Sequence, residues 1–367
     1  MGIVTFCRHN AVLVISILAA LVTAIIVPPD GLYLGYYDLR TLTCLFCVLA
    51  VVRAFSNIRL FYILARKVVQ YFRSTRAAIL ALVWITMIGS MLITNDTALL
   101  TFLPLSYFVL HATGQDKYLA LTFILQNCAA NLGGMLTPFG NPQNLYLYTK
   151  FSISNAEFLQ IMLPPFLLSV LLFSLCVLAV KPEPLTVPEE PVALDGHRAA
   201  LYGALFLVAL TVVLRLVPYG VGLVVIPAVL LFADRKALAQ VDYKLLLTFA
   251  AFFTFSGNMA RMEGVQTLFS GLLEHDPLLV GALLSQIISN VPAAILLSQF
   301  TQDYAPLLQG VNIGGAGTLI ASLASLITYQ EFMRHRPSEG GRFLKLFTII
   351  NVAFLVILLG AMKLLGA

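Results

Sequence analysis

Residues 131–145 read NLGGMLTPFGNPQNL, and residues 312–326 read NIGGAGTLIASLASL. Aligned without gaps, the two stretches are identical at Asn131/Asn312, Gly133/Gly314, Gly134/Gly315, Thr137/Thr318 and Leu145/Leu326. Each stretch lies in an apolar segment, 118–150 or 305–331, that is too long for one simple membrane span. Because glycine and proline disfavour a continuous helix there, we predict two discontinuous helices that are related by an internal repeat.

The composition around these stretches is that of a membrane protein. Of the 367 residues, 60% are hydrophobic and 11% are charged, whereas soluble domains carry about 25% charged residues. Apolar stretches recur along the whole chain, which predicts many membrane-spanning helices rather than one anchor. The net charge of +5 does not indicate nucleic-acid binding, because lysine and arginine cluster in the loops between apolar spans.

The first apolar run, 11–27, follows Arg8, and a signal peptide is its competing interpretation. The run is long for the core of a signal peptide, and VPPD (27–30) lacks the small residues of a cleavage site. We therefore expect a retained first span with a cytoplasmic N-terminus.

Two further apolar segments, 77–110 and 277–300, are interrupted by the polar triplets TND (94–96) and SNV (289–291). We predict that each is a re-entrant hairpin, which enters and leaves the membrane on one side. Nine spanning helices then remain, and 17 of the 22 Lys and Arg residues fall on the cytoplasmic side. Most of these lie in 53–76, 181–198, 233–244 and 331–345, and 53–76 also has the pattern of an amphipathic helix on the inner membrane surface.

The order of span, span, hairpin, broken helix and span occurs twice. YDLRTL (37–42) resembles VDYKLL (241–246) at the start of matching spans, and the extra span 199–216 inverts the second copy. The predicted fold class is an all-α polytopic membrane protein, an inverted-repeat bundle with two re-entrant hairpins and two discontinuous helices. The first repeat covers 1–180 with hairpin 77–110 and broken helix 118–150, a cytoplasmic linker covers 181–198, and the second inverted repeat covers 199–367 with hairpin 277–300 and broken helix 305–331.

Paired broken helices in inverted repeats indicate a transport site near the membrane midplane. Unpaired backbone groups are tolerated there only where they line a cavity, and they can then bind anions or cations. Asp96 is an acid deep inside an apolar segment, where an ionised carboxylate costs at least about 2.5–3.5 kcal/mol, so we expect it to face a cavity. The predicted substrate- and ion-binding residues are Thr94, Asn95, Asp96, Asn131, Gly133, Gly134, Thr137, Pro138, Asn141, Asn144, Ser289, Asn290, Asn312, Gly314, Gly315, Thr318, Ser322 and Ser325.

Structural roles compete with binding at these positions. Asp96 is suited to capping a helix at the hairpin tip, and Asn95 and Asn290 are suited to clamping the turns. Glycine in a kinked helix can serve close packing alone. Outside the site, Arg215 lies near the outer end of a span, where we expect its side chain to snorkel toward the interface.

These features resemble the ion transporter superfamily, which includes divalent anion/sodium symporters, citrate-transporter-like permeases and arsenical pumps. The triplets at 94–96 and 289–291 are similar to its Ser-Asn-Thr-like hairpin tips, and GGMLTPFGNPQN (133–144) is similar to its unwound helices, with 314–325 a looser match. The resemblance covers roughly residues 11–365. Asp96 and Val291 replace the threonine-like hydroxyls of dicarboxylate carriers, so the Asn-Asp tip is more similar to the arsenical-pump branch, whereas GNPQN (140–144) is more similar to the anion permeases.

We expect a secondary active transporter, not an enzyme, that moves a small inorganic or organic anion or oxyanion coupled to Na⁺ or H⁺. Efflux of a neutral hydroxide such as arsenite, or cation/proton antiport, is the alternative, and a channel or an intramembrane enzyme has less support. We expect no catalytic residue, no cofactor and no metal beyond a coupling or transported Na⁺. The expected partners are the substrate anion and the lipid bilayer of the inner membrane, not nucleic acid, and a homodimer is left open.

Overall fold

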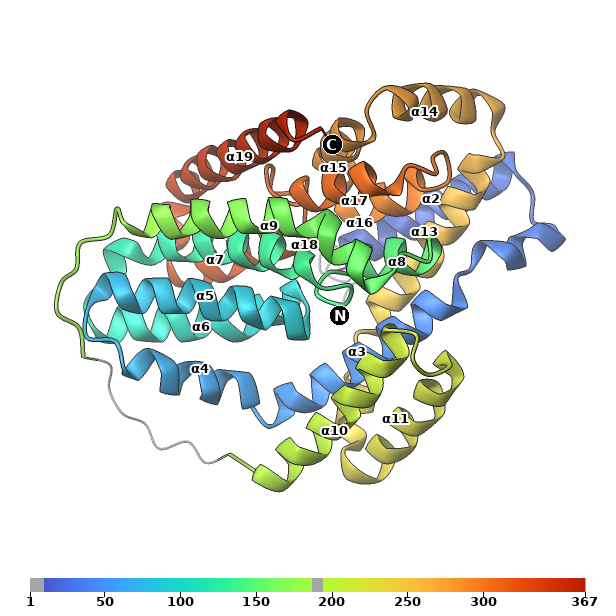
Figure 1. Ribbon diagram of the computed structural model, residues 1–367. Helices are drawn as coiled ribbons and strands as arrows, with labels where there is room; N and C mark the ends of the chain where they lie inside the picture. Colours follow the sequence, from blue (N-terminus) through green and yellow to red (C-terminus); the bar gives the residue numbers. More distant parts are fainter. Residues whose placement is uncertain (1–9, 187–193, 367) are drawn as a thin grey trace.

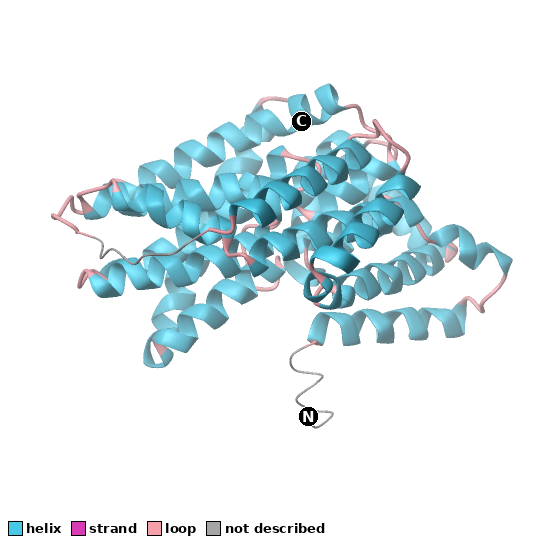
Figure 2. Ribbon diagram, turned by 90° about the horizontal axis from the view of Figure 1, so that it is seen from below, coloured by secondary structure: helices cyan, strands magenta, loops and turns pink. Residues whose placement is uncertain are grey.

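The computed structural model describes residues 10–186 and 194–366, and every regular element in these ranges is a helix (Figure 1, Figure 2). Parts of the predicted linker 181–198 and of the N-terminal segment with Arg8 lie outside the described residues. The α-helices are α2 (Ala11–Ile26), α3 (Leu39–Asn57), α4 (Leu60–Gln70), α5 (Thr75–Ile93), α6 (Asn95–Ala112), α7 (Leu119–Gly133), α8 (Pro142–Lys150), α9 (Asn155–Val177), α10 (Gly196–Val213), α11 (Tyr219–Ala233), α12 (Arg235–Ala239), α13 (Tyr243–Ala260), α14 (Glu263–His275), α15 (Pro277–Ile288), α16 (Asn290–Leu297), α17 (Tyr304–Ile313), α18 (Leu323–His335) and α19 (Gly340–Leu364).

Seven helices within the described ranges are long and apolar enough to cross a membrane. The chain is therefore an all-α polytopic membrane protein, as predicted. Six of the seven correspond to predicted spans, and the seventh is α5 of the first predicted hairpin. The predicted spans α2 and α11 are shorter apolar helices.

Both hairpins break at the predicted polar triplets. Helix α5 ends and α6 begins around Thr94, whose φ is 71°, and α15 is followed by α16 at Ser289, whose φ is 76°. A positive φ is uncommon for a residue with a side chain, so both turns are held in a strained backbone conformation by their surroundings. In each hairpin the two helices pack against each other, and Figure 1 shows α5 and α6 side by side.

The lengths of the hairpin helices bear on how they sit in the membrane. Helices α15 and α16 have 12 and 8 residues, so they rise about 18 and 12 Å, well short of the ~30 Å hydrocarbon core. Helices α5 and α6 have 19 and 18 residues, so each rises about 28 Å and is long enough to span. The re-entrant course of the hairpins and the inversion of the second repeat stay predictions.

Both predicted discontinuous helices are present. Helix α7 ends at Gly133 and is followed by a short 3-10 turn, Gly134–Leu136, before α8 begins at Pro142. Helix α17 ends at Ile313, and α18 begins only at Leu323. We call residues 134–141 the first break and residues 314–322 the second break. Each break contacts one hairpin tip. The candidate site lies where these four non-helical segments meet.

Matching aspartates begin two of the helices. Asp38 caps α3 by accepting a hydrogen bond from Thr41 N at 3.0 Å, and Asp242 caps α13 by accepting one from Leu245 N at 3.0 Å. These are the aspartates of the two similar stretches at 37–42 and 241–246. A side chain that accepts an otherwise unpaired amide stabilises a helix start by about 1 kcal/mol.

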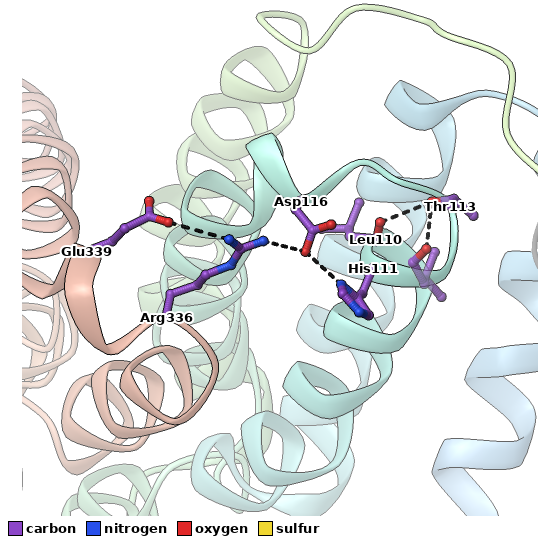
Figure 3. A network of polar contacts seen from close by, with 7 residues as sticks. Leu110, His111, Thr113, Asp116, Arg336 and Glu339 are labelled. Atoms are coloured by element: carbon purple, nitrogen blue, oxygen red, sulfur yellow. Dashed lines mark hydrogen bonds and ion pairs between the residues drawn. The ribbon is translucent and has the colours of Figure 1, made fainter.

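Loops that were predicted to be cytoplasmic gather on one face of the protein. Thr75 N donates to Glu183 O at 2.9 Å, and Lys117 Nζ lies 2.7 Å from Glu183 Oε1, which holds the pKa of that carboxyl below its usual range. On the same face Arg336 lies 2.8 Å from Asp116, which also accepts from a histidine on α6 (Figure 3). These contacts join 53–76, the loop before α7, the linker and the loop before α19.

Other ion pairs tie the loops that were predicted to be external. Arg261 pairs with Asp30 at 2.7 Å, and Lys363 pairs with Asp276 at 2.5 Å. The expectation that Arg215 snorkels stays a prediction; its guanidinium donates to the carbonyl oxygens of Tyr148 and, at 3.1 Å, Ile153. The carbonyls at a helix C-terminus lack partners within the helix, so Arg215 caps α8.

Candidate functional site

Each hairpin tip holds one break through the same backbone contact. Asn95 N donates to Gly140 O at 3.1 Å, and Asn290 N donates to Ala321 O at 3.0 Å. These amides are the first of α6 and α16, where they have no partner inside their own helix. The two tips are thereby fixed against the two breaks in equivalent ways.

The two predicted threonines also hold the breaks to the hairpins. Thr137 Oγ1 donates to Met91 O at 2.9 Å, and Thr318 Oγ1 donates to Gln286 O at 3.2 Å. Both accepting residues lie three positions before a hairpin tip. The hydroxyl protons of this pair are therefore used for structure, and only their oxygens can accept a further hydrogen bond.

The first glycine of each pair allows two helices to approach closely. A Cβ atom on Gly133 would lie 2.6 Å from Met87 Cγ, and one on Gly314 would lie 2.9 Å from Ala282 Cα. Met87 and Ala282 both lie seven residues before a tip. The role of Gly133 and Gly314 in the structure is steric, because any side chain would push α7 away from α5 and α17 away from α15.

The second glycine of each pair lies against an asparagine side chain. A Cβ atom on Gly134 would be 2.5 Å from Asn141 Oδ1, and one on Gly315 would be 2.9 Å from Asn290 Nδ2. Each glycine thus leaves room for a carboxamide beside the backbone of its break. Such close approach is a use of glycine that other residues cannot replace.

The two breaks contact each other across the repeats. Asn141 Nδ2 donates to Asn312 Oδ1 at 3.2 Å, and Ser322 Oγ donates to Asn131 Oδ1 at 2.8 Å. Asn141 and Ser322 are matching positions, ten residues after Asn131 and Asn312 respectively. All four side chains are buried. The structure therefore brings these predicted residues together in one polar junction between the repeats.

The two tips differ in their side-chain partners. Asn95 Nδ2 donates to Asn131 Oδ1 at 3.0 Å. The side chain of Asn290 has no hydrogen-bond partner within the described ranges, although the residue is only 4% exposed. Asp96 Oδ1 is likewise buried with no partner among the residues described. Buried polar atoms are nearly always paired, so unpaired ones at a hairpin tip are candidates for contact with a ligand.

Four further predicted residues do not take part in the contacts described above between the two repeats. Thr94 Oγ1 donates to a neighbouring hydroxyl at 3.2 Å, and Ser289 Oγ donates to the Ala321 carbonyl at 3.3 Å. Pro138 is buried within the first break. Ser325 Oγ is buried and has no partner in the part of the chain that the structure describes. Binding by any of the predicted residues stays a prediction.

A cavity of about 1030 Å³ reaches the tip of the first hairpin. Its lining includes Thr94 and Asp96 of the hairpin tip, Pro142 at the start of α8, and the basic residues Arg53 and Lys244. The segments 53–76 and 233–244 belong to the face with the predicted cytoplasmic loops. The cavity thus connects the candidate site with that face, and its volume is at the upper end of the range for small-molecule sites.

Charge is unevenly distributed along this cavity. Arg53, Arg59 and Lys244 line it, together with the acids Asp96 and Asp242. Asp242 is engaged as the cap of α13, as described above, and Arg53 donates to the side chain of Gln240 at 2.7 Å. Asp96 belongs to the hairpin tip. The basic lining residues attract anions, whereas the tip itself presents a carboxylate and neutral polar groups.

Sequence reasoning missed several residues of the polar junction. Gln143 Nε2 donates to Asn312 Oδ1 at 3.0 Å, and Asn131 Nδ2 donates to Asn127 Oδ1 at 3.4 Å. Asn127 Nδ2 continues to Asn351 Oδ1 on α19 at 3.3 Å. All of these side chains are buried. The available signal was their polarity inside apolar segments, since a buried carboxamide needs a partner.

Comparison with known proteins agrees with this arrangement. A sequence model of the citrate transporter family matches residues 1–311. The chain is 32% identical over 326 residues to an uncharacterized transporter of Methanocaldococcus jannaschii, with 88% of this chain and 89% of that protein covered. It is 32% identical over 277 residues to the inner membrane protein YbiR of Escherichia coli, with 73% of each covered. It is 30% identical over 176 residues to the silicon efflux transporter LSI3 of Oryza sativa subsp. japonica, with 45% of this chain and 36% of that protein covered.

Proposed function

The chain belongs to the citrate transporter family, and from that premise we propose that it is a secondary active transporter of a small anion or oxyanion, coupled to H⁺ or Na⁺. The observation that carries this proposal is the cavity that leads from one face to the junction of hairpin tip and break. A cavity that opens a buried polar site toward one face is compatible with alternating access. We place the N-terminus and the basic loops in the cytoplasm of a cell whose inner membrane holds the protein.

The charges of the cavity explain how coupling would arise. Arg53, Arg59 and Lys244 attract an anion into the cavity, but Asp96 repels it at the tip while ionised. A proton on Asp96, or a cation beside it, removes that repulsion. Binding of the coupling ion and binding of the anion then favour each other, which is the free-energy coupling that a symporter needs.

A neutral hydroxide is the second candidate substrate. The hairpin tip offers the hydroxyl of Thr94 and the carboxyl of Asp96 to the cavity. Hydroxyl and carboxyl groups suit the hydrogen-bonding needs of an uncharged polyhydroxylated solute. A relative over part of the chain is named as a silicon efflux transporter, which favours this candidate.

We infer that the protein is not an enzyme. The cavity contains two acids, but Asp242 is occupied as a helix cap, and the family to which the chain belongs is one of transporters. A homodimer stays a proposal, as does the division into two inverted repeats.

Uptake by proteoliposomes tests the function. Purified protein is reconstituted, and a panel of carboxylates and oxyanions, together with neutral arsenous and silicic acids, is offered under a proton gradient or a sodium gradient imposed separately. We expect one class of solute to accumulate above equilibrium under one gradient. The matched variants are Asp96→Asn, which should stop or uncouple uptake, and Glu274→Gln on the exposed surface of α14, which should not change it. Flux that equilibrates each solute without accumulation would instead indicate a channel.

A further inference from the structure

The carbonyl groups of the first break are occupied by a side-chain amide of the chain itself. Asn144 Nδ2 lies 3.4 Å from Gly134 O, 3.2 Å from Met135 O and 3.2 Å from Thr137 O. Its amide orientation is fixed from the other side, because Asn144 Oδ1 accepts a hydrogen bond from Asn312 Nδ2 at 2.6 Å. Asn144 is fully buried, so its NH₂ group fills the space among these three carbonyls.

The second break has the same feature, but the amide comes from another element. Gln286 Nε2 lies 2.7 Å from Gly314 O and 3.2 Å from Ala316 O, and Gln286 Oε1 accepts from Thr318 N at 2.8 Å. The side chain is so close to the break that a Cβ atom on Gly317, whose φ is 119°, would lie 2.2 Å from Gln286 Oε1.

The two amide donors do not lie at matching positions of the repeat. The position that matches Asn144 in the second repeat is Ser325, which is too short to reach the carbonyls in the same way and whose hydroxyl is unpaired within the described chain. The position that matches Gln286 in the first repeat is Met91, which has no amide. Each break therefore has one carboxamide donor, although the two donors are not related by the repeat.

The amide groups occupy the space in which the carbonyls of the breaks could bind a cation. Carbonyls at the end of a broken helix carry partial negative charge and can ligate a cation, with hard cations taking oxygen ligands at about 2.3–2.6 Å. An NH₂ group at hydrogen-bond distance from the same carbonyls occupies that space and supplies the positive end of a dipole instead. A sodium ion could enter only by displacing a buried amide and leaving it unpaired, which is costly.

We propose that Asn144 and Gln286 are internal ligands that hold the two breaks and close their carbonyls to sodium, so that sodium is not the coupling ion of this transporter. The inference rests on the proposed function, since it specifies the ion of the same site. It leaves Asp96 as the group at the cavity wall that can exchange a proton with the accessible face.

Sodium binding by the purified full-length protein tests the proposal without any solute. Binding of radioactive sodium and the midpoint of thermal unfolding are measured in sodium chloride and in choline chloride. We expect no saturable binding and no difference in midpoint for the wild type. Asn144→Asp and Gln286→Glu place a carboxylate among the carbonyls, so each should gain saturable sodium binding and a rise in midpoint of about 2 °C or more in sodium chloride.

The matched control is Asn258→Asp on α13, because Asn258 is as buried as Asn144 but donates to a single hydroxyl, that of Thr23, at 3.2 Å. This variant should gain no sodium response. Saturable sodium binding by the wild type would overturn the proposal, and so would folded Asn144→Asp and Gln286→Glu proteins that both ignore sodium. If neither variant folds, the wild-type measurement decides alone. Failure of the solute uptake assay would refute the proposed function and leave this result unaffected.

Discussion

Asn95 and Asn290 occupy matching positions at the two hairpin tips, but the structure predicts unequal effects on stability when each is replaced by alanine. Asn95 Nδ2 donates to Asn131 Oδ1 at 3.0 Å, and Asn95 Oδ1 accepts from Asp96 N at 2.9 Å. The side chain of Asn290 makes no hydrogen bond to any described residue, and its carboxamide only packs against Gly315.

The expected magnitudes follow from these contacts. Asn95→Ala removes one buried and one part-buried hydrogen bond at about 1 kcal/mol each, so the free energy of unfolding should fall by about 2 kcal/mol. Asn290→Ala removes a buried carboxamide that has no partner. Because no hydrogen bond to a described residue is lost, this change should alter the free energy of unfolding by less than about 1 kcal/mol. Transport should be lost in both variants if both asparagines contact the solute.

Thermal unfolding of the purified variants in detergent, together with proteoliposome uptake, measures both effects. The midpoint should fall by several degrees for Asn95→Ala and should change little for Asn290→Ala. Destabilisation of Asn290→Ala as large as that of Asn95→Ala would refute the reasoning, because it would mean that Asn290 clamps its turn. Full transport by a folded Asn290→Ala protein would refute its place in the binding site.

Three further predictions concern coupling, topology and packing. Asp96→Asn should stop or uncouple transport and flatten its dependence on pH, measured as initial uptake rates over a pH series; an unchanged profile would exclude Asp96 as the coupling group. Single cysteines at the exposed positions Lys67 and Glu263, on a cysteine-free background, should label from opposite sides of the membrane, and labelling from the same side would contradict the inverted repeat. Gly140→Ala should cost roughly 1–3 kcal/mol or prevent folding, because its Cβ would lie 2.3 Å from a backbone carbonyl of the first break. Gly203→Ala on α10 is the control, with nothing within 4 Å of the added Cβ, and equal loss of folded protein in both would contradict this packing argument.

The sequence determined where the helices break. Glycine and proline at 133–142 and the polar triplets at Thr94 and Ser289 act through local backbone preferences, so the observed breaks coincide with them. Helix α14 was missed, because an amphipathic helix that is not buried has no continuous apolar run to reveal it. The hydrophobic composition likewise fixed the class of protein, since a chain with so few charges needs lipid around it.

The partners within the site were decided by the tertiary structure alone. The repeat predicts equal roles for Asn95 and Asn290, but one is hydrogen-bonded to Asn131 and the other is not. Likewise, no spacing in the sequence pairs Gln286 with the second break, 28 residues away along the chain. A hydrogen bond requires donor and acceptor within about 3 Å and in line. That geometry depends on how helices far apart in sequence pack, and similar local sequences in two repeats do not fix it.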